Sequence, residues 1–374
     1  MRIVFTIPAP KELYMFKIVG DLLRKHGHEI FYLVRDYGPN KEIADNILTE
    51  YAIFGKKYFK KSVGKISEFL YNMSFPLKYL LKISPDLIVG DCLLGYPSKV
   101  MNIPSIAFID GDPVGLYKIL YNSLYLSDVF VTPKYNSWIS YKKKIIRYNG
   151  LQELVYLHPK YFRPDPKALN FIGVSRKNNF VIIRLSALEM SHDVGLKSIS
   201  SKQLQFIVNK LSQYFDVYIS SEKKLENFFS KYLLRIPPHL FHSALYYSSL
   251  FISDTASAVE AALLGTPSIQ ISPVDPLYRP IFNQYSTFLY VSKAGLMKIF
   301  SCTNINELLK ILSYYSEDIE NQKRLQRERA KYFIDQHIDV ATFFAWFIHK
   351  YPVSLNLCLQ SGSCDDVAMR LMEK

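Results

Sequence analysis

The sequence predicts an α/β protein of two domains, each built on a parallel sheet with helices packed against its faces. Short apolar runs of strand length alternate with amphipathic stretches of helical length, and this rhythm occurs twice along the chain. The length of 374 residues suits two domains at about 150 residues each. Hydrophobic residues make up 49% of the chain, enough for each domain to bury a core, which excludes a disordered protein.

The first domain begins with a β-α-β unit. Residues 2–7 are the expected first strand, 13–26 the helix and 29–34 the second strand, with Gly27 ending the helix. The pattern continues with a helix that runs to Met101 and with strands expected at 86–89, 104–109 and 128–132. Since helical crossovers leave successive strands parallel, one parallel sheet is predicted.

The second domain starts after the irregular, proline-bearing segment 158–166. Its strands are expected at 180–185, 216–220 and 250–253. Helices are expected between them, at 202–214 and 240–248. From residue 304 to 350 the chain turns helical and charged, and we expect terminal helices that cross back over the first domain. The predicted division is therefore a first domain at 1–165, a second at 166–350 and a tail at 351–374.

Missing signals exclude several classes of protein. The first β-α turn, PAPKE, contains no glycine, and no G-x-x-x-x-G-K-[ST] loop occurs. The sequence therefore gives little support to the binding of a nicotinamide cofactor or of ATP, and no cofactor is expected. The four cysteines fit neither a disulfide framework nor a zinc site. No apolar stretch reaches the roughly 18 residues of a membrane span, and no signal peptide precedes the first strand, so a cytoplasmic protein is expected.

The most informative stretch is LFISDTASAVEAALLGTPSIQIS, residues 250–272, which predicts a strand, a tight turn, a helix and a strand. Asp254 or Thr255 can cap the helix. Small residues at its start leave the first backbone N–H groups open to a diphosphate, namely Thr255, Ala256 and Ser257. Glu260, about one turn further in, can accept hydrogen bonds from vicinal ribose hydroxyls. An ordinary capped helix with a solvated glutamate is the alternative.

Polar residues also gather at the ends of two other expected strands in this domain. The strand at 180–185 ends with Arg184 and is followed by Ser186, and both side chains can bind a phosphate group. Glu189, His192 and Asp193 follow in the next loop. For His192 a structural and a catalytic role both stay open. The strand at 216–220 ends in further candidates for donor binding, Ser220 and Ser221, followed by Glu222. Ordinary loop chemistry is the alternative for each of them.

Four stretches carry a resemblance to a known family. They are YNGLQELVYLHPKYFRPDP (148–166), FVIIRLSALEMSHDVG (180–195), VYISSEK with LRIPPHLFHSALYYSSLFIS, and EAALLGTPSI (260–269). Together they resemble archaeal and bacterial proteins that carry a domain of unknown function and are predicted GT-B glycosyltransferases. That family is related to the non-hydrolysing UDP-N-acetylglucosamine 2-epimerases and to the lipid-linked N-acetylglucosaminyltransferase of peptidoglycan synthesis.

The resemblance runs to about residue 350 and implies a GT-B-like fold, with two Rossmann-like domains facing an interdomain cleft. It implies a UDP-sugar or similar donor held by the second domain, near Glu260, and an acceptor held by the first. Where the family has histidines in the first β-α turn, this chain has Pro8, Ala9, Pro10, Lys11 and Glu12, so no catalytic base is carried over from that turn. The acid–base residues of the epimerases are likewise not identifiable by motif, which weakens the interpretation of this chain as an epimerase.

Aspartates follow the expected strands of the first domain, at Asp91, Asp110 and Asp112. Sugar transfer to a hydroxyl passes through an oxocarbenium-like state, and a base must take the acceptor proton. We expect Asp110 or Asp112 to do so, with His192 contributed by the second domain. Asp110-Gly111-Asp112 also spells the D-x-D string that binds a metal in another glycosyltransferase class. Because that class has a single nucleotide-binding domain, no metal site is expected.

The net charge of +13 is concentrated in part between residues 51 and 83, where seven lysines accompany one glutamate among many aromatic residues. Mixed basic and aromatic residues fit the headgroup layer of an anionic membrane. Single-stranded nucleic acid is a competing partner, but no nucleic-acid motif is present. We therefore expect peripheral attachment at the inner membrane face and no nucleic acid, and a solvated lysine face stays open.

These observations favour a metal-independent glycosyltransferase of polysaccharide biosynthesis, which moves a sugar from a nucleotide sugar to a lipid-linked or surface-glycan acceptor. Two alternatives stay open. A nucleotide-sugar 2-epimerase has the same fold, and a non-catalytic scaffold that binds sugar nucleotides or membranes needs only a binding site.

Overall fold

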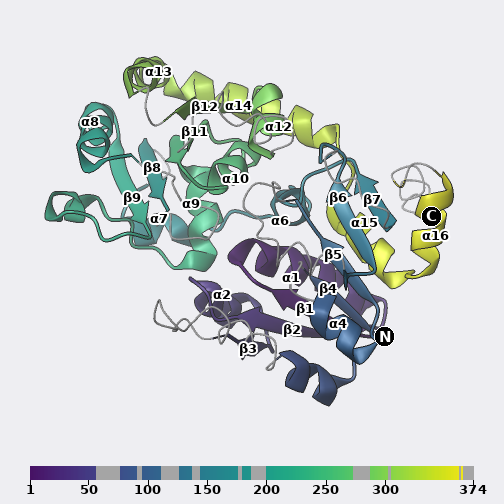
Figure 1. The fold of residues 1–374 in the computed structure, drawn as a ribbon. Helices are drawn as coiled ribbons and strands as arrows, with labels where there is room; N and C mark the ends of the chain where they lie inside the picture. The colour runs from purple at the N-terminus through teal and green to yellow at the C-terminus, as the bar shows by residue number, and fades with distance from the viewer. Residues whose placement is uncertain are drawn as a thin grey trace. The chain divides into compact units, whose positions relative to one another are not determined.

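The computed structural model describes residues 1–55, 76–90, 95–110, 126–136, 144–175, 179–186, 199–272, 287–301, 305–361 and 364. These residues form two compact units (Figure 1). Unit 1 consists of those within Met1–Asp110, Leu116–Tyr161 and His337–Lys374, and unit 2 of those within Phe162–Gln336. The end of the chain, from residue 337 on, belongs to unit 1.

The described strands of unit 1 form one parallel sheet in the order β3-β2-β1-β4-β5-β6-β7. They are β1 Arg2–Ile7, β2 Glu29–Arg35, β3 Ala52–Phe54, β4 Leu87–Gly90, β5 Ser105–Phe108, β6 Val129–Pro133 and β7 Lys144–Tyr148. The chain runs outward from β1 to β3 and then returns to place β4 on the other side of β1. β1 and β4 therefore border the topological switch point of this sheet.

The described helices of unit 1 include α1 Pro10–Lys25, α2 Asn40–Ile47, α4 Gly95–Met101 and α6 Leu154–Leu157. Two more come from the end of the chain, α15 Val340–His349 and α16 Val353–Ser361. α15, with the sequence VATFFAWFIH, is apolar on nearly every side and packs against α1 and α6 (Figure 1). A helix of this composition is stable only when buried on most sides, which explains why it lies within unit 1.

A capping residue fixes the start of α15. The Asp339 carboxylate accepts hydrogen bonds from the Thr342 backbone N–H at 3.0 Å, from Lys160 Nζ at 2.7 Å and from the Tyr161 hydroxyl at 2.8 Å. Burial alone would raise the pKa of Asp339, but these hydrogen bonds outweigh it and hold the pKa below its usual value. The cap therefore stays ionised and joins α15 to the segment that ends unit 1 before residue 162.

The described strands of unit 2 form a second parallel sheet, in the order β12-β11-β10-β8-β9. They are β8 Phe180–Leu185, β9 Asp216–Ser221, β10 Leu250–Ser253, β11 Ser268–Ser272 and β12 Met297–Ser301. The described α-helices are α7 Lys167–Ile172, α8 Ser201–Leu211, α9 Phe241–Tyr247, α10 Ser257–Leu263, α12 Thr287–Lys293, α13 Ile305–Glu317 and α14 Ile319–Asp335. Two short 3-10 helices, η2 Asn227–Tyr232 and η3 Pro238–Leu240, precede α9.

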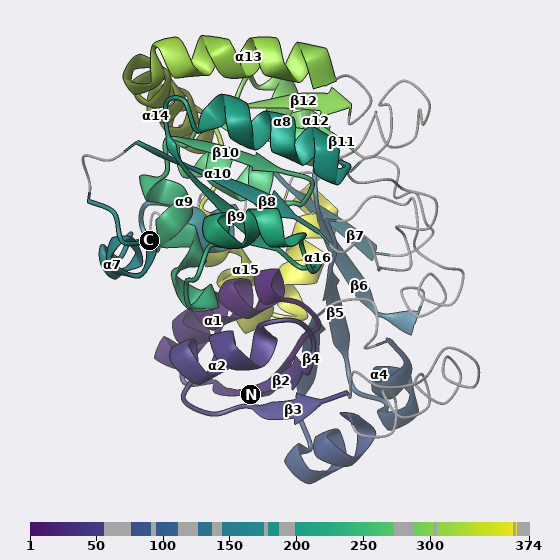
Figure 2. The same cartoon turned by 90° about the vertical axis from the view of Figure 1, so that its left-hand side faces the viewer.

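Side chains of β10 alternate between the two faces of this sheet. Leu250 and Ile252 pack into a core with α8 and α13, which lie side by side in Figure 2. Phe251 points the other way and meets the Phe241 ring of α9, with 6.3 Å between ring centroids. Because helices cover both faces of the sheet, the residues of this strand form a continuous apolar run in the sequence.

The prediction of two parallel sheets with helices is confirmed. Each strand expected from the sequence appears within one residue of its expected bounds. β3, β7 and β12 were not expected, and each lies at an edge of its sheet, where burial is incomplete and the apolar signal is weak. A disulfide bond joins Cys358 to Cys364, a pairing that the sequence did not predict.

Three histidines gather where the end of α15 meets the turn after α1. His349 Nδ1 lies 2.7 Å from His28 Nε2, and the His349 ring stacks on that of His26 at 4.6 Å. Burial lowers the pKa of His28 and of His349. The N-terminal amine and His26 lower both pKa values further, and Lys350 lowers that of His349. The contact between α15 and the turn after α1 therefore favours the neutral form of His28 and of His349.

This cluster predicts that unit 1 loses stability in mild acid. The folded state binds protons at His28 and His349 more weakly than the unfolded chain does. The free energy of unfolding therefore falls as the pH drops through the usual histidine pKa of about 6.5 and on toward the lowered folded values. We expect urea unfolding of the His349→Gln variant to depend less on pH between about 7 and 5 than the parent protein. Identical pH profiles for the two proteins would contradict this interpretation.

Candidate functional site

The sheet of unit 2 has its topological switch point between β8 and β10. These strands are neighbours, with Arg184 opposite Ser253, but the chain leaves β8 toward β9 and leaves β10 toward β11. Ligands of open α/β sheets bind at such a switch point, outside the carboxyl ends of the strands. The Asp254 carboxylate bridges the loops by accepting a hydrogen bond from the Ser186 backbone N–H at 2.7 Å.

Arg184 lies at this switch point and is already bound to its neighbours. Its guanidinium donates to Ser220 Oγ at 3.0 Å and to the Glu222 carboxylate at 2.8 Å, and lies 5.1 Å from the centroid of the Phe241 ring. Arg184 Nε and Ser186 Oγ are buried, and neither has a hydrogen-bond partner among the described residues. Since buried polar atoms are nearly always paired, these two favour a polar ligand at this edge.

The start of α10 differs from the expectation of open backbone donors. Ser253 Oγ accepts a hydrogen bond from the Thr255 N–H at 2.9 Å, and Thr255 Oγ1 accepts one from the Ser257 N–H at 3.3 Å. Serine and threonine hydroxyls beside a turn readily bind nearby amides, so this turn satisfies two of its own donors. The Ala256 N-cap contributes no side-chain bond. A diphosphate at this turn would therefore replace hydroxyl partners.

A largely buried contact between a carboxylate and an imidazole lies one turn further along. Glu260 Oε1 is 3.1 Å from His242 Nε2, and the two side chains are only 12% and 8% exposed. Glu260 lies in the first turn of α10 and His242 near the start of α9, two helices that pack together. A carboxylate this buried requires a hydrogen-bond partner, and the imidazole both supplies it and fixes its orientation. The result is an oriented acceptor in the helix that follows the switch-point loop.

The structure brings Arg184, Ser186 and Ser220 to neighbouring strand ends in unit 2. Ser221 instead folds onto Lys223, with Oγ donating to its carbonyl at 2.9 Å and accepting from its N–H at 3.1 Å. Several sequence-predicted residues lie outside the described residues: Asp91, Asp112, Glu189, His192 and Asp193.

In unit 1 the predicted base Asp110 follows β5 and forms an ion pair with Lys11, at the start of α1. Lys11 also donates to Glu153 Oε1 at 2.8 Å, and the Glu153 side chain is 3% exposed. The ammonium group therefore lies between two carboxylates and compensates the charge of the buried one, Glu153. Lys11 stands in the turn where the resembled family has histidines.

Sequence reasoning missed His242 and Lys11 as partners of the candidate residues. His242 lies inside LRIPPHLFHSALYYSSLFIS, one of the stretches that carry the resemblance. Its pairing with Glu260 joins two different helices, so no spacing within one element could reveal it. The only available signal was a histidine at the start of an otherwise apolar helix.

Within the described ranges, no group of three or more His, Cys, Asp or Glu side chains is placed to hold a metal ion. The helices in that same part of the chain include none long and apolar enough to cross a membrane. Most lysines of the basic stretch at 51–83 lie outside the described residues, so the membrane hypothesis stays a prediction.

Comparison with known proteins bears on the fold. No protein-family model and no curated protein matches the sequence. The UDP-GlcNAc 2-epimerase from Neisseria meningitidis, bound to UDP-GlcNAc, matches with a TM-score of 0.56 at 16% identity, over 90% of this chain and 99% of that one. The Streptomyces sp. SF2575 glycosyltransferase SsfS6 matches with a TM-score of 0.50 at 12% identity, over 88% and 96%. Arabidopsis thaliana UGT89C1, complexed with UDP, matches with a TM-score of 0.56 at 11% identity, over 92% and 99%.

The matching structures share an architecture but include both epimerases and glycosyltransferases. At these identities the likeness concerns the fold. The resemblance inferred from the sequence agrees with it, because that family is predicted to have this fold and is related to the epimerases. The chain therefore has the two-domain, Rossmann-like GT-B fold that UDP-GlcNAc 2-epimerases and glycosyltransferases share.

Proposed function

We propose that this chain is a glycosyltransferase that moves a sugar from a nucleoside-diphosphate sugar to an acceptor hydroxyl. The buried Glu260–His242 pair beside the switch point of unit 2 carries the proposal, because it offers an oriented carboxylate to a ribose. UDP-GlcNAc and UDP are bound in two of the similar structures, which supports a UDP-sugar as the donor. No further cofactor enters the proposal.

Each candidate residue of unit 2 has a role in this proposal. Glu260 accepts hydrogen bonds from the ribose hydroxyls, and His242 positions its carboxylate. Arg184 binds the diphosphate in partial exchange for Glu222, since phosphate and carboxylate suit the same guanidinium edge. Hydroxyl and backbone N–H groups complete the diphosphate contacts, from Ser186, Ser220, Ser221, Thr255, Ala256 and Ser257.

The reaction exchanges one bond at the sugar. The bond from C1 to the diphosphate oxygen breaks, and a bond from C1 to the acceptor oxygen forms. The acceptor proton passes to a base, and the nucleoside diphosphate leaves with the bonding electrons. Positive charge and N–H donors at the diphosphate stabilise this leaving group, so the proposal requires no metal ion. The proposed candidates for the base are Asp110, Asp112 and His192.

The proposed acceptor is a lipid-linked or surface glycan, reached through the basic and aromatic stretch at 51–83 on an anionic membrane. A nucleotide-sugar 2-epimerase is the second candidate, because epimerases match the fold at least as well as glycosyltransferases do. The two differ in one observable respect. A transferase needs an acceptor, whereas an epimerase isomerises its substrate alone.

Turnover with UDP-sugars tests this proposal. The purified chain is incubated with UDP-GlcNAc and related donors, with and without a membrane lipid extract, and nucleotide and sugar products are separated by chromatography. We expect release of UDP that depends on the extract and persists in a chelator. A new sugar isomer without extract would establish the epimerase, and binding without either product would indicate a scaffold. Failure of every UDP-sugar to bind in calorimetry would overturn the assignment of the site.

A further inference from the structure

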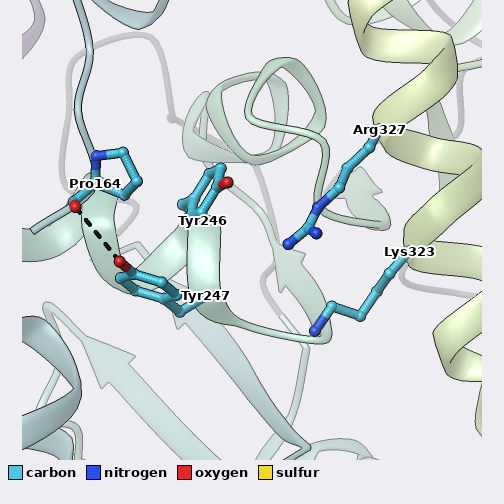
Figure 3. A pocket seen from close by; sticks show the side chains of 5 residues that line it. All are labelled: Pro164, Tyr246, Tyr247, Lys323 and Arg327. Carbon is cyan, nitrogen blue, oxygen red and sulfur yellow. Dashed lines mark hydrogen bonds between the residues drawn. The ribbon is translucent and has the colours of Figure 1, made fainter. Parts of the chain in front are cut away.

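A cavity in unit 2 lies away from the switch point. It has a volume of about 470 Å³ and is lined by Pro164, Tyr246, Tyr247, Lys323 and Arg327 (Figure 3). The two tyrosines end α9 just before β10 begins, so the cavity lies at the amino edge of the sheet. The turn that starts α10 follows β10 at the carboxyl edge. The cavity is therefore separate from the proposed donor site.

α14 supplies both cations of the cavity and is held in place by Gln326. This side chain is buried, and its amide donates to the Ala262 carbonyl at 3.3 Å and to the Leu296 carbonyl at 2.7 Å. Lys323 and Arg327 are four residues apart, so they share one face of the helix. Figure 3 shows both side chains directed into the cavity. The two charges are thus brought together by a fixed helix.

The opposite wall and the arginine are also constrained. The Tyr247 hydroxyl donates to the Pro164 carbonyl at 3.4 Å. The Arg327 guanidinium carbon lies 5.4 Å from the centroid of the Tyr246 ring. Gly265, with φ of +80°, lets the Arg327 backbone approach so closely that a Cβ there would lie 3.1 Å from Arg327 Cα. A guanidinium held beside a ring keeps its planar fork of N–H donors oriented for an anion.

The two cations of this cavity have no ion-pair partner among the described residues. By contrast, Arg324 on the same helix pairs with Glu328 at 2.7 Å. Burial lowers the pKa of Lys323, Glu320 acts against this, and Arg327 lowers the pKa again. Like charges four residues apart on a helix repel each other. A bound anion would remove that repulsion.

We propose that this cavity binds a phosphate monoester, as a second anion site at the edge of the sheet opposite the donor site. Such a group carries roughly −1.5 to −2 charge at neutral pH, which matches the two cations. The Arg327 fork binds two phosphate oxygens and the Lys323 ammonium a third. The cavity is larger than a phosphate group, and Tyr246 and Tyr247 offer apolar ring surface to the organic part of the ester.

Calorimetry with phenyl phosphate at fixed ionic strength tests this site. We expect the full chain to bind it, and the double variant Lys323→Gln/Arg327→Gln to weaken binding at least about tenfold, since two charge-assisted contacts are lost. Lys323→Arg should retain binding. Arg324→Gln, on the same helix but outside the cavity, is the matched control and should bind as the parent does. Arg184→Gln reports whether phenyl phosphate binds at the donor site instead. The double variant should melt no lower than the parent, because it removes a repulsion.

If Arg184→Gln loses binding and the double variant does not, phenyl phosphate binds at the donor site and the proposal is overturned. Equal affinity of all variants would also overturn it. A second arm uses vesicles that contain phosphatidic acid. Vesicle binding that the double variant loses would support the site with a lipid headgroup as its ester, whereas binding of phenyl phosphate alone supports a soluble ester. These outcomes do not depend on whether the chain transfers sugar.

Discussion

Replacing Glu260 with Gln is expected to weaken the binding of UDP by about 1 to 3 kcal/mol, or roughly 5- to 150-fold in Kd. The amide keeps the size of the side chain but lacks the negative charge that strengthens hydrogen bonds from ribose hydroxyls. In the parent protein, Glu260 Oε1 lies 3.1 Å from His242 Nε2, and this contact orients the carboxylate. An NH₂ group in the place of that oxygen does not accept a hydrogen bond from the imidazole, so the side chain loses its orientation. Isothermal titration calorimetry measures the change directly.

Two further variants make this result specific. Glu328→Gln, at an exposed ion pair on α14, removes the same charge elsewhere in unit 2 and should leave Kd unchanged. His242→Gln should weaken binding less than Glu260→Gln, because the carboxylate remains but is no longer held by the imidazole. If Glu260→Gln melts like the parent protein and binds UDP equally well, the ribose does not lie at Glu260.

Truncating Phe344 to Ala is expected to destabilise unit 1 by about 3 to 5 kcal/mol. The Phe344 side chain is fully buried in α15, with its ring centroid 4.2 Å from that of Phe108 and 5.1 Å from that of Tyr148. The substitution removes the ring that joins the end of the chain to strands β5 and β7, and it leaves a cavity that a packed sheet cannot close. Urea unfolding followed by circular dichroism gives the difference.

The matched control is Phe171→Ala in α7, where the same side chain is 54% exposed. We expect a change within about 0.5 kcal/mol there, as for most surface substitutions. A similarly small effect of Phe344→Ala would mean that unit 1 is stable without α15. The capping of α15 by Asp339 would then be a local contact and not part of the fold of unit 1.

The candidate site was predictable only in part. Arg184, Ser186 and Ser220 could be chosen from the sequence because each stands at the end of an apolar run, and parallel strands end at a common edge. Their contacts could not be predicted, since Arg184 meets Ser220 and Glu222 across two strands. The turn before α10 shows the same limit. Its small hydroxyl residues were identified, but whether those hydroxyls bind the backbone depends on turn geometry.

The sequence alone was enough to predict the class of fold and every described strand except the edge strands β3, β7 and β12. Strands β8 and β10 lie between helices on both faces, so every residue is apolar along most of their length, and the pattern is local. The contacts between residues far apart in the chain are visible only in the folded protein: Glu260 with His242, and Lys11 with Asp110 and Glu153. Such pairs depend on how helices pack and on where each strand enters the sheet, and neither leaves a periodic signal along the chain.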